Sequence, residues 1–245
     1  MEEIRLSVVV PAYNEEKRLP GTLKALDKYL SNQDYKYEIV VVDDGSKDNT
    51  AGVTKELSSQ MSNLRLVDNK ENNGKGYVVR QGMMEAKGKY RLFTDADNST
   101  TVDHVEKMFP YFDKGFDVVI GSREIKGAVL DPPQGFARRM TGAAFRLLTN
   151  IFTGLWEIED TQCGFKCFTG EAVENVFPFC RIDRFAFDPE LLVVAKRKGY
   201  KIKEVPIRWV NDVNSKVNFK SMAKMGFDLI KIRKNLIKKV YDKEE

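Results

Sequence analysis

The chain has 245 residues, of which 42% are hydrophobic and 31% are charged, and its formal net charge is +4. This length is enough for one domain with a sizeable core, and the composition is that of an ordinary globular protein. No uninterrupted apolar run approaches the ~18–20 residues of a membrane-spanning helix, and the first apolar segment has no features of a secretion signal.

Four apolar, β-branched segments within the first hundred residues predict buried strands, with apolar residues at helical spacing between them. The strands are expected at residues 6–11, 37–43, 64–68 and 90–94, and the helices at 19–30, at 50–59 and from the turn at 72–76 to residue 86. This alternation predicts an α/β fold, with a mostly parallel sheet and helices on both faces.

The rest of the chain continues the alternation less regularly, with polar segments that predict loops at residues 124–134 and 211–218. Helices are expected at residues 102–112, 136–156, 184–198 and 219–241, and strands at 116–121, just after 160–166, and at 202–209. The last helix is basic, because residues 216–240 hold eight Lys or Arg and one acid, Asp228.

The sequence holds three cysteines and a single histidine, His104. An odd number of cysteines, Cys163, Cys167 and Cys180, predicts free thiols in a reducing compartment. The small number of cysteine and histidine ligands argues against a structural zinc site.

Acidic side chains follow several of the predicted strands. Asp95 and Asp97 alone suit a polar turn or a helix cap as well as a metal site. The carboxyl ends of parallel strands meet at one edge of the sheet, where ligands bind. The charged residues expected to gather there are Glu15, Asp43, Asp44, Lys75, Asp95 and Asp97. This convergence favours a divalent cation that holds a phosphate group.

Four motifs at these strand ends resemble the nucleotide-sugar half of family 2 glycosyltransferases. They are Val-Pro-Ala-Tyr-Asn-Glu at residues 10–15, Val-Asp-Asp-Gly-Ser at 42–46, Asn-Gly-Lys-Gly at 73–76 and Thr-Asp-Ala-Asp at 94–97. Further motifs, at residues 121–123, 160–166, 184–191 and 215–216, resemble the polyprenyl-phosphate branch. Within it the chain looks most like dolichyl-phosphate β-glucosyltransferases, with dolichyl-phosphate mannose synthases as near relatives.

The resemblance implies the GT-A fold, a Rossmann-like arrangement with a mostly parallel central sheet and a C-terminal helical extension. We expect one catalytic domain over residues 1–218, with a nucleotide-sugar half at about 1–122 and an acceptor half at about 123–218. Residues 219–245 would form the basic C-terminal helix, either in the same domain or facing a membrane.

The resemblance also implies roles for residues of the first half. Pro11, Ala12 and Tyr13 would flank the base of the nucleotide sugar, and Glu15 and Asp44 would hydrogen-bond the base and ribose. The remaining residues of the donor site would be Asp43, Lys75, Asp95 and Ala96. Asp95 and Asp97 would hold Mg²⁺ or Mn²⁺, and Asp97 would act in catalysis through this metal.

In the second half, the resemblance places the acceptor phosphate on cationic side chains. The candidates are Arg123, Arg139 and Lys216, with Arg138 as an alternative to Arg139. Asp160 matches the catalytic carboxylate of inverting GT-A enzymes, and Arg123 is counted with it as catalytic. Asp160 would act either as a general base or as an orienting group, because a phosphate acceptor is already ionised.

The implied reaction is inverting transfer of a hexose, with UDP-glucose as favoured donor and a polyprenyl or dolichyl phosphate as acceptor. GDP-mannose as donor, a non-lipid acceptor and a nucleotide-sugar-binding regulator are the alternatives. Asn98 and Ser99 depart from the mannose-synthase pattern, which continues Asp-Ala-Asp with Leu-Gln. A lipid acceptor implies peripheral attachment to the cytoplasmic face of a membrane through the helix at 136–156 and the basic C-terminal helix, and we expect no nucleic-acid partner.

Overall fold

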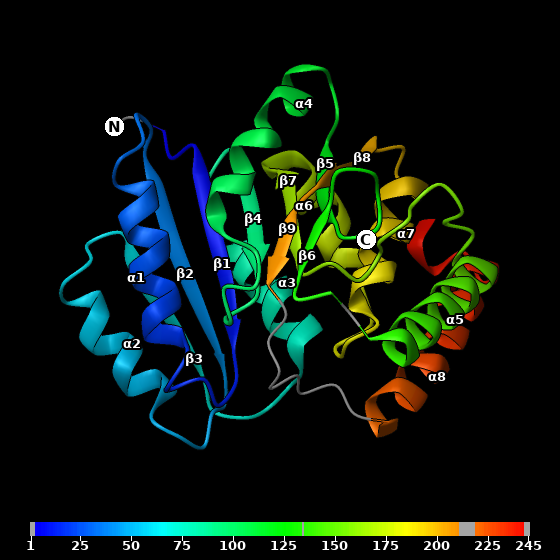
Figure 1. The fold of residues 1–245 in the computed structure, drawn as a ribbon, viewed down its shortest axis with the longest axis horizontal. Coiled ribbons are helices and arrows are strands. Elements are labelled where there is room, and N and C mark those ends of the chain that lie inside the picture. The colour runs from blue at the N-terminus through cyan, green and yellow to red at the C-terminus, as the bar shows by residue number, and fades with distance from the viewer. Residues whose placement is uncertain (1–2, 134, 211–218, 243–245) are drawn as a thin grey trace.

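A seven-stranded sheet forms the centre of the molecule in the computed structural model, which describes residues 3–133, 135–210 and 219–242 (Figure 1). Its strand order is β3-β2-β1-β4-β7-β5-β8, and only β7 runs antiparallel to its neighbours. The strands are β1 (Leu6–Ala12), β2 (Tyr37–Asp44), β3 (Leu64–Asn69), β4 (Tyr90–Thr94), β5 (Val118–Ser122), β7 (Phe165–Thr169) and β8 (Ile202–Pro206). The predicted mostly parallel sheet is therefore confirmed.

Helices cover both faces of this sheet (Figure 1). They are α1 (Leu19–Leu30), α2 (Thr50–Ser58), α3 (Lys75–Glu85), α4 (Phe109–Asp113), α5 (Phe136–Thr153), α6 (Gly170–Val176), α7 (Phe187–Arg197) and α8 (Phe219–Ile237). Successive side chains of β1 lie alternately in the two layers of the core, on opposite faces of the sheet. Val9 packs in the layer that includes α3 and α7, whereas Val8 and Val10 pack with α1.

The structure corrects the predicted helix at residues 102–112, which is divided in two. A 3₁₀ helix covers Val102–Lys107, and α4 begins at Phe109. Pro110 explains the division, because proline has no N–H to continue a helix from the preceding turn and is tolerated only in the first turn of a helix, where it stands in α4. The helix expected from residue 184 begins later, at Phe187.

Two further predictions differ from the structure in the second half. The strand expected over residues 202–209 is divided into β8 and a short strand, β9 (Arg208–Val210). The segment at 124–134, expected to be a loop, contains β6 (Val129–Asp131), which pairs in parallel with β9. Helix α6, directly after β7, was not predicted.

The C-terminal helix α8 packs along α5, as Figure 1 shows at its right side. Met225, Leu229 and Ile232 of α8 are buried in the core cluster that also contains residues of α7. The proposed division of the chain into two functional halves remains a prediction. Among the described residues, no helix combines the length and the apolar character needed to cross a lipid bilayer.

Substituting Gly82 by alanine should destabilise the protein. A Cβ atom at Gly82 would lie 2.5 Å from Val9 Cγ1 and 2.7 Å from Val42 Cγ2, and both valines are fully buried. We expect Gly82→Ala to lower the free energy of unfolding by about 1–3 kcal/mol, because overpacking displaces stiff strand side chains. Urea unfolding measures this change.

The matched control is Gly142→Ala in the middle of α5, where nothing lies within 4 Å of an added Cβ. Because alanine has the higher helix propensity, this variant should be as stable as the wild type or up to about 1 kcal/mol more stable. Equal unfolding midpoints for the two variants would show that α3 does not pack as closely on the sheet as described.

Candidate active site

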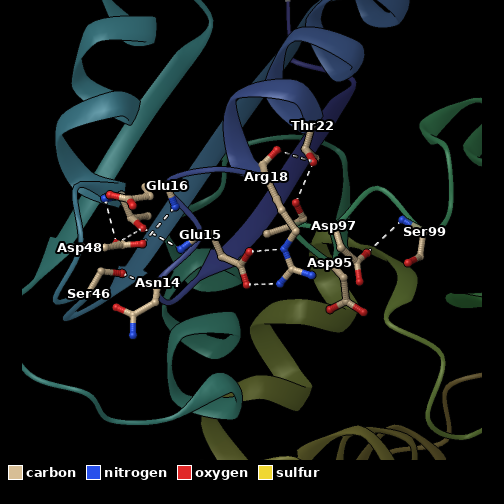
Figure 2. A network of polar contacts seen from close by, with 12 residues as sticks. Asn14, Glu15, Glu16, Arg18, Thr22, Ser46, Asp48, Asp95, Asp97 and Ser99 are labelled. Atoms are coloured by element: carbon tan, nitrogen blue, oxygen red, sulfur yellow. Dashed lines mark hydrogen bonds and ion pairs between the residues drawn. The ribbon is translucent and has the colours of Figure 1, made fainter. Parts of the chain in front are cut away.

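The carboxyl ends of β1, β2 and β4 lie side by side, because β1 pairs in parallel with both of its neighbours. The segment 13–15 follows β1, Asp43 and Asp44 end β2, and the turn 95–97 follows β4. The acidic residues expected to gather at this edge are therefore brought together, and Figure 2 shows several of them. The buried residues Pro11 and Ala12 form the end of β1.

Asp44 holds the loop that leads into α3. Its carboxylate accepts hydrogen bonds from the backbone N–H of Asn73 at 2.7 Å and of Gly74 at 3.0 Å, and from the Asn72 side chain at 2.9 Å. The pKa of Asp44 is raised by burial, although the hydrogen bonds from the two backbone N–H groups act to lower it. Asp44 thus fixes the backbone on which Lys75 is carried.

Gly74 and Gly76 let this loop approach the segment before α7 closely. Gly74 has a φ of +105°, and a Cβ there would lie 2.3 Å from the carbonyl oxygen of Asp183. The Gly76 N–H donates to the same oxygen at 2.8 Å. The two glycines are therefore required by backbone contact, which positions Lys75 at the first residue of α3.

The turns after β1 and β2 are tied to one another. The Asn14 N–H donates to Ser46 Oγ at 2.9 Å, and the Ser46 N–H donates to the Asp43 carboxylate at 3.0 Å. Glu15 is 8% exposed, and its carboxylate accepts hydrogen bonds from Nε and Nη2 of Arg18, each at 2.7 Å (Figure 2). Arg18 was not predicted to be part of the site, although a cation three residues after a buried acid is a recognisable signal.

Asp95 and Asp97 stand in different surroundings although one residue separates them. Asp95 Oδ1 accepts from Lys75 Nζ at 2.5 Å, and the Lys75 side chain is 24% exposed. Asp97 Oδ1 accepts from the Ser99 N–H at 2.9 Å. Burial and the neighbouring carboxylate of Asp95 raise the pKa of Asp97. Burial acts to lower the pKa of Lys75, but Asp95 and Asp188 outweigh it and raise that pKa to about 12.

Two contacts that the sequence did not reveal hold this turn. The Thr22 hydroxyl donates to the carbonyl oxygen of Ala96 at 2.7 Å. A Cβ at Gly164 would lie only 2.1 Å from Asp95 Oδ2, so the carboxylate rests directly on the backbone before β7. A side chain at position 164 would therefore displace the Asp95 carboxylate.

Arg123 and Asp160, both predicted site residues, are paired with one another. Nε and Nη2 of Arg123 donate to the two oxygens of Asp160 at 2.8 and 2.9 Å, and the Arg123 N–H adds a third bond at 3.0 Å. Burial acts to raise the pKa of Asp160, but Arg123 outweighs it and holds that pKa below its usual range. The guanidinium carbon lies 5.6 Å from the centre of the Trp209 ring. Asp160 is therefore ionised and hydrogen-bonded to Arg123, which makes it a weak proton acceptor.

A second buried ion pair, absent from the predicted site, supports this region. Lys166 of β7 is fully buried and donates to the Asp188 carboxylate and to the carbonyl oxygen of Cys163. The segment before β7 is fixed from the other side by Glu204, which accepts from the N–H of Glu159 at 2.9 Å and of Asp160 at 3.0 Å. A lysine within an otherwise apolar strand was the available sequence signal.

The other two predicted phosphate ligands lie away from these contacts or outside the described residues. Arg139 is exposed on α5, and Lys216 lies outside the described residues.

The three cysteines are free and buried side chains without a disulfide partner: Cys163, Cys167 and Cys180. Burial raises the pKa of the Cys163 thiol to about 12. His104 Nε2 accepts from the Arg208 N–H at 2.9 Å, which links the helical region after β4 to β9. Among the described residues, no group of three or more His, Cys, Asp or Glu forms a metal site.

Solved structures with this arrangement include glycosyltransferases. Glucosyl-3-phosphoglycerate synthase of Mycobacterium tuberculosis, in complex with Mn²⁺, UDP and glucosyl-3-phosphoglycerate, superposes with a TM-score of 0.69 at 17% identity, covering 99% of this chain and 81% of that one. Mannosyl-3-phosphoglycerate synthase of Rubrobacter xylanophilus gives 0.69 at 16% identity, covering 99% and 77%. These similarities confirm the GT-A fold.

Residues 7–177 match the family model described as Glycosyl transferase family 2. A dolichyl-phosphate beta-glucosyltransferase of Trichomonas vaginalis is 37% identical over 242 residues, which is 94% of this chain and 73% of that protein. Those of Saccharomyces cerevisiae and Homo sapiens are each 36% identical, covering 96% and 94% of this chain and 74% and 75% of the relative. The chain therefore belongs to glycosyl transferase family 2, as a glycosyltransferase related to the dolichyl-phosphate beta-glucosyltransferases.

Proposed function

We propose that the protein transfers glucose from UDP-glucose to the phosphate of a dolichyl or related polyprenyl lipid, with inversion at the anomeric carbon. One observation carries the proposal: relatives named dolichyl-phosphate beta-glucosyltransferase are 36–38% identical over nearly the whole chain. The geometry agrees with it, since a donor edge rich in acids lies in the same fold as a partly buried arginine, Arg123, that suits a phosphate acceptor.

The donor half is suited to a nucleoside diphosphate and a divalent cation. Asp95 and Asp97 place two carboxylates close enough for the charge of one to raise the pKa of the other, and hard oxygen ligands suit Mg²⁺ or Mn²⁺. The donor's phosphate oxygens would complete the coordination. A bound cation would supply charge neutralisation for the departing diphosphate. Lys75, within reach of Asp95, adds a second positive charge for the same leaving group.

Arg123 and Asp160 act as one unit in the proposed acceptor site. A lipid phosphate is ionised near neutral pH, so its attack on the sugar needs no general base. Asp160 instead holds the guanidinium of Arg123 in a fixed orientation through two side-chain bonds and one backbone bond. Of the two roles that the family resemblance implies for Asp160, we therefore favour orientation of the acceptor over proton removal.

Peripheral attachment to the cytoplasmic face of a membrane would bring the enzyme to its lipid acceptor. Helices α5 and α8 pack together and expose large apolar side chains to solvent. On α5 these are Met140, Leu147, Leu148 and Ile151, and on α8 they are Phe227, Ile230 and Ile237. Exposed cations accompany them, including Arg139, Lys224, Lys231 and Lys234. An amphipathic surface with this charge suits an anionic lipid surface.

The proposed reaction predicts that label from UDP-glucose appears in a lipid-extractable product when the protein is incubated with dolichyl-phosphate vesicles and Mg²⁺ or Mn²⁺. The reaction should stop with EDTA and resume when the metal is restored, because a bound cation would neutralise the charge that develops on the leaving diphosphate. A panel of labelled UDP- and GDP-sugars gives the comparison. Mannose transfer from GDP-mannose in place of glucose would contradict the assigned donor.

Two variants extend this measurement to the proposed metal ligands. Asp97→Asn should lower transfer at least about a hundredfold at saturating metal, since it removes a charged ligand. Asp103→Asn, which changes a half-exposed acid in the following 3₁₀ helix, should transfer like the wild type. Transfer that persists in EDTA would exclude the metal role of Asp97.

The paired roles of Arg123 and Asp160 predict non-additive losses. Asp160→Asn should raise KM for the lipid phosphate about tenfold while KM for the donor changes little, because the arginine loses its charged partner. In the Arg123→Gln background, Asp160→Asn should cause no further increase in KM for the lipid phosphate. Initial rates over both substrates give these values.

Glu174→Gln provides a matched control, because it removes the carboxylate that Arg91 Nη2 contacts at 2.9 Å in another part of the protein. This variant should keep both KM values. Full activity of Asp160→Asn would eliminate an essential role for Asp160, and additive losses with Arg123→Gln would separate the two residues.

The exposed faces of α5 and α8 predict binding to anionic vesicles. The double variant Leu148→Glu/Ile151→Glu should weaken vesicle binding at least about tenfold, because each leucine- or isoleucine-sized side chain contributes about 1.5–3 kcal/mol on burial. Co-sedimentation with vesicles measures the change. Met84→Glu, at an exposed apolar residue of α3, should leave binding unchanged. Undiminished sedimentation of the double variant would place the membrane contact elsewhere.

A further inference from the structure

The turn between the acceptor pair and the donor carboxylates carries a polar side chain with an unused donor. Gln162 Nε2 is buried and has no hydrogen-bond partner within the described parts of the chain. A buried donor without a partner costs about 1–3 kcal/mol, so native proteins rarely keep one unless a ligand or water satisfies it. Within the site, Ser99 Oγ also lacks a partner among the described residues, whereas the carboxylates described above are all paired with protein groups.

The position of Gln162 is fixed from both sides. Its backbone N–H donates to Asp160 Oδ1 at 3.3 Å, which ties it to the pair with Arg123. Two residues later, Gly164 lies against the carboxylate of Asp95. The segment 160–164 therefore runs from the proposed acceptor phosphate to the proposed metal and diphosphate, with Gln162 at its midpoint.

The group that must lie between these two ends during the reaction is the transferred sugar. A hexose presents several hydroxyl groups, and a primary amide can donate to one of them while its oxygen accepts from another. A glutamine is neutral, so it does not compete with the arginine for phosphate or with the aspartates for the metal. This chemistry separates Gln162 from the charged groups around it.

We propose that Gln162 is a specificity-determining residue that hydrogen-bonds a hydroxyl group of the donor's hexose. This inference rests on the proposed function and adds to it the residue that recognises the sugar. Gln162 completes its hydrogen bonding only when the sugar is bound, so its contribution is absent from the binding of UDP alone. A site built to bond a hydroxyl discriminates against sugars that lack it or present it differently.

The test compares UDP with UDP-glucose on Gln162→Leu, in the presence of Mn²⁺. Calorimetric titration should show UDP affinity within about twofold of the wild type, whereas kcat/KM for UDP-glucose should fall about tenfold, the value of one hydrogen bond. The variant should unfold at the same or a higher temperature, because it removes an unsatisfied buried amide. A purely structural role would instead lower stability and weaken both ligands.

Deoxy analogues of the donor identify the hydroxyl group. Wild-type kcat/KM should fall for the analogue that lacks the bonded hydroxyl, and Gln162→Leu should show no further loss with that analogue. Gln162→Glu, which keeps the acceptor and removes the donor, provides a second variant if the leucine does not fold. Gln60→Leu, at an exposed residue after α2, controls for the change of side-chain class.

The outcomes separate the two levels of inference. Unchanged kcat/KM for UDP-glucose in Gln162→Leu, equal losses for UDP and UDP-glucose, or additive losses with every deoxy analogue would overturn the role of Gln162. Failure of the wild type to transfer glucose to a lipid phosphate would overturn the proposed function, and the same variants would then report sugar recognition through donor binding alone.

Discussion

The parallel alignment of β1, β2 and β4 forces acidic side chains together at one edge of the sheet, and much of the site compensates for that concentration of charge. A partly buried carboxylate is costly unless a cation or several donors meet it. Different groups compensate the charge of each acid. Lys75 meets Asp95, Arg18 meets Glu15, and Asp44 is met by backbone N–H groups.

The same principle extends beneath the site into the second half of the chain. Lys166 is fully buried against Asp188, and Arg123 is held by Asp160. Losing one member of such a pair leaves a buried charge without a partner, which costs far more than the pair contributes when intact. These pairs therefore fix the relative positions of β7, α7 and the segment 160–164. The segment 160–164 in turn lies between Arg123 and the Asp95 carboxylate, so both border on these charge contacts.

Much of the first half could be predicted because its signals are local. The bounds of α1 match the expected helix, and the acids at the ends of β2 and β4 meet where parallel strands require. The contacts that hold these acids in place could not be predicted from local sequence signals. Gly164 and Thr22 act through approaches between segments far apart in sequence, and the pairing of Arg123 with Asp160 depends on where β5 and the loop before β7 meet.

Irregular structure explains the failures in the second half. Pro110 divided an expected helix, and β6 was missed because a three-residue strand with polar neighbours has no periodicity to detect. Its partner β9 brings Trp209 over Arg123, so a pairing that the sequence did not indicate helps to shape the surroundings of Arg123.

The departure at Asn98 also has a physical reading in the structure. Asn98 has a φ of +54°, a conformation that asparagine adopts far more readily than leucine, the residue that the mannose-synthase pattern places there. This conformation follows directly after Asp97 and precedes Ser99, whose N–H binds the Asp97 carboxylate. The turn that aims Asp97 is thus built for asparagine, and a leucine would have to be accommodated by a different backbone path. A departure from a family motif next to Asp97 can therefore change how this acid is held, without changing the acid itself.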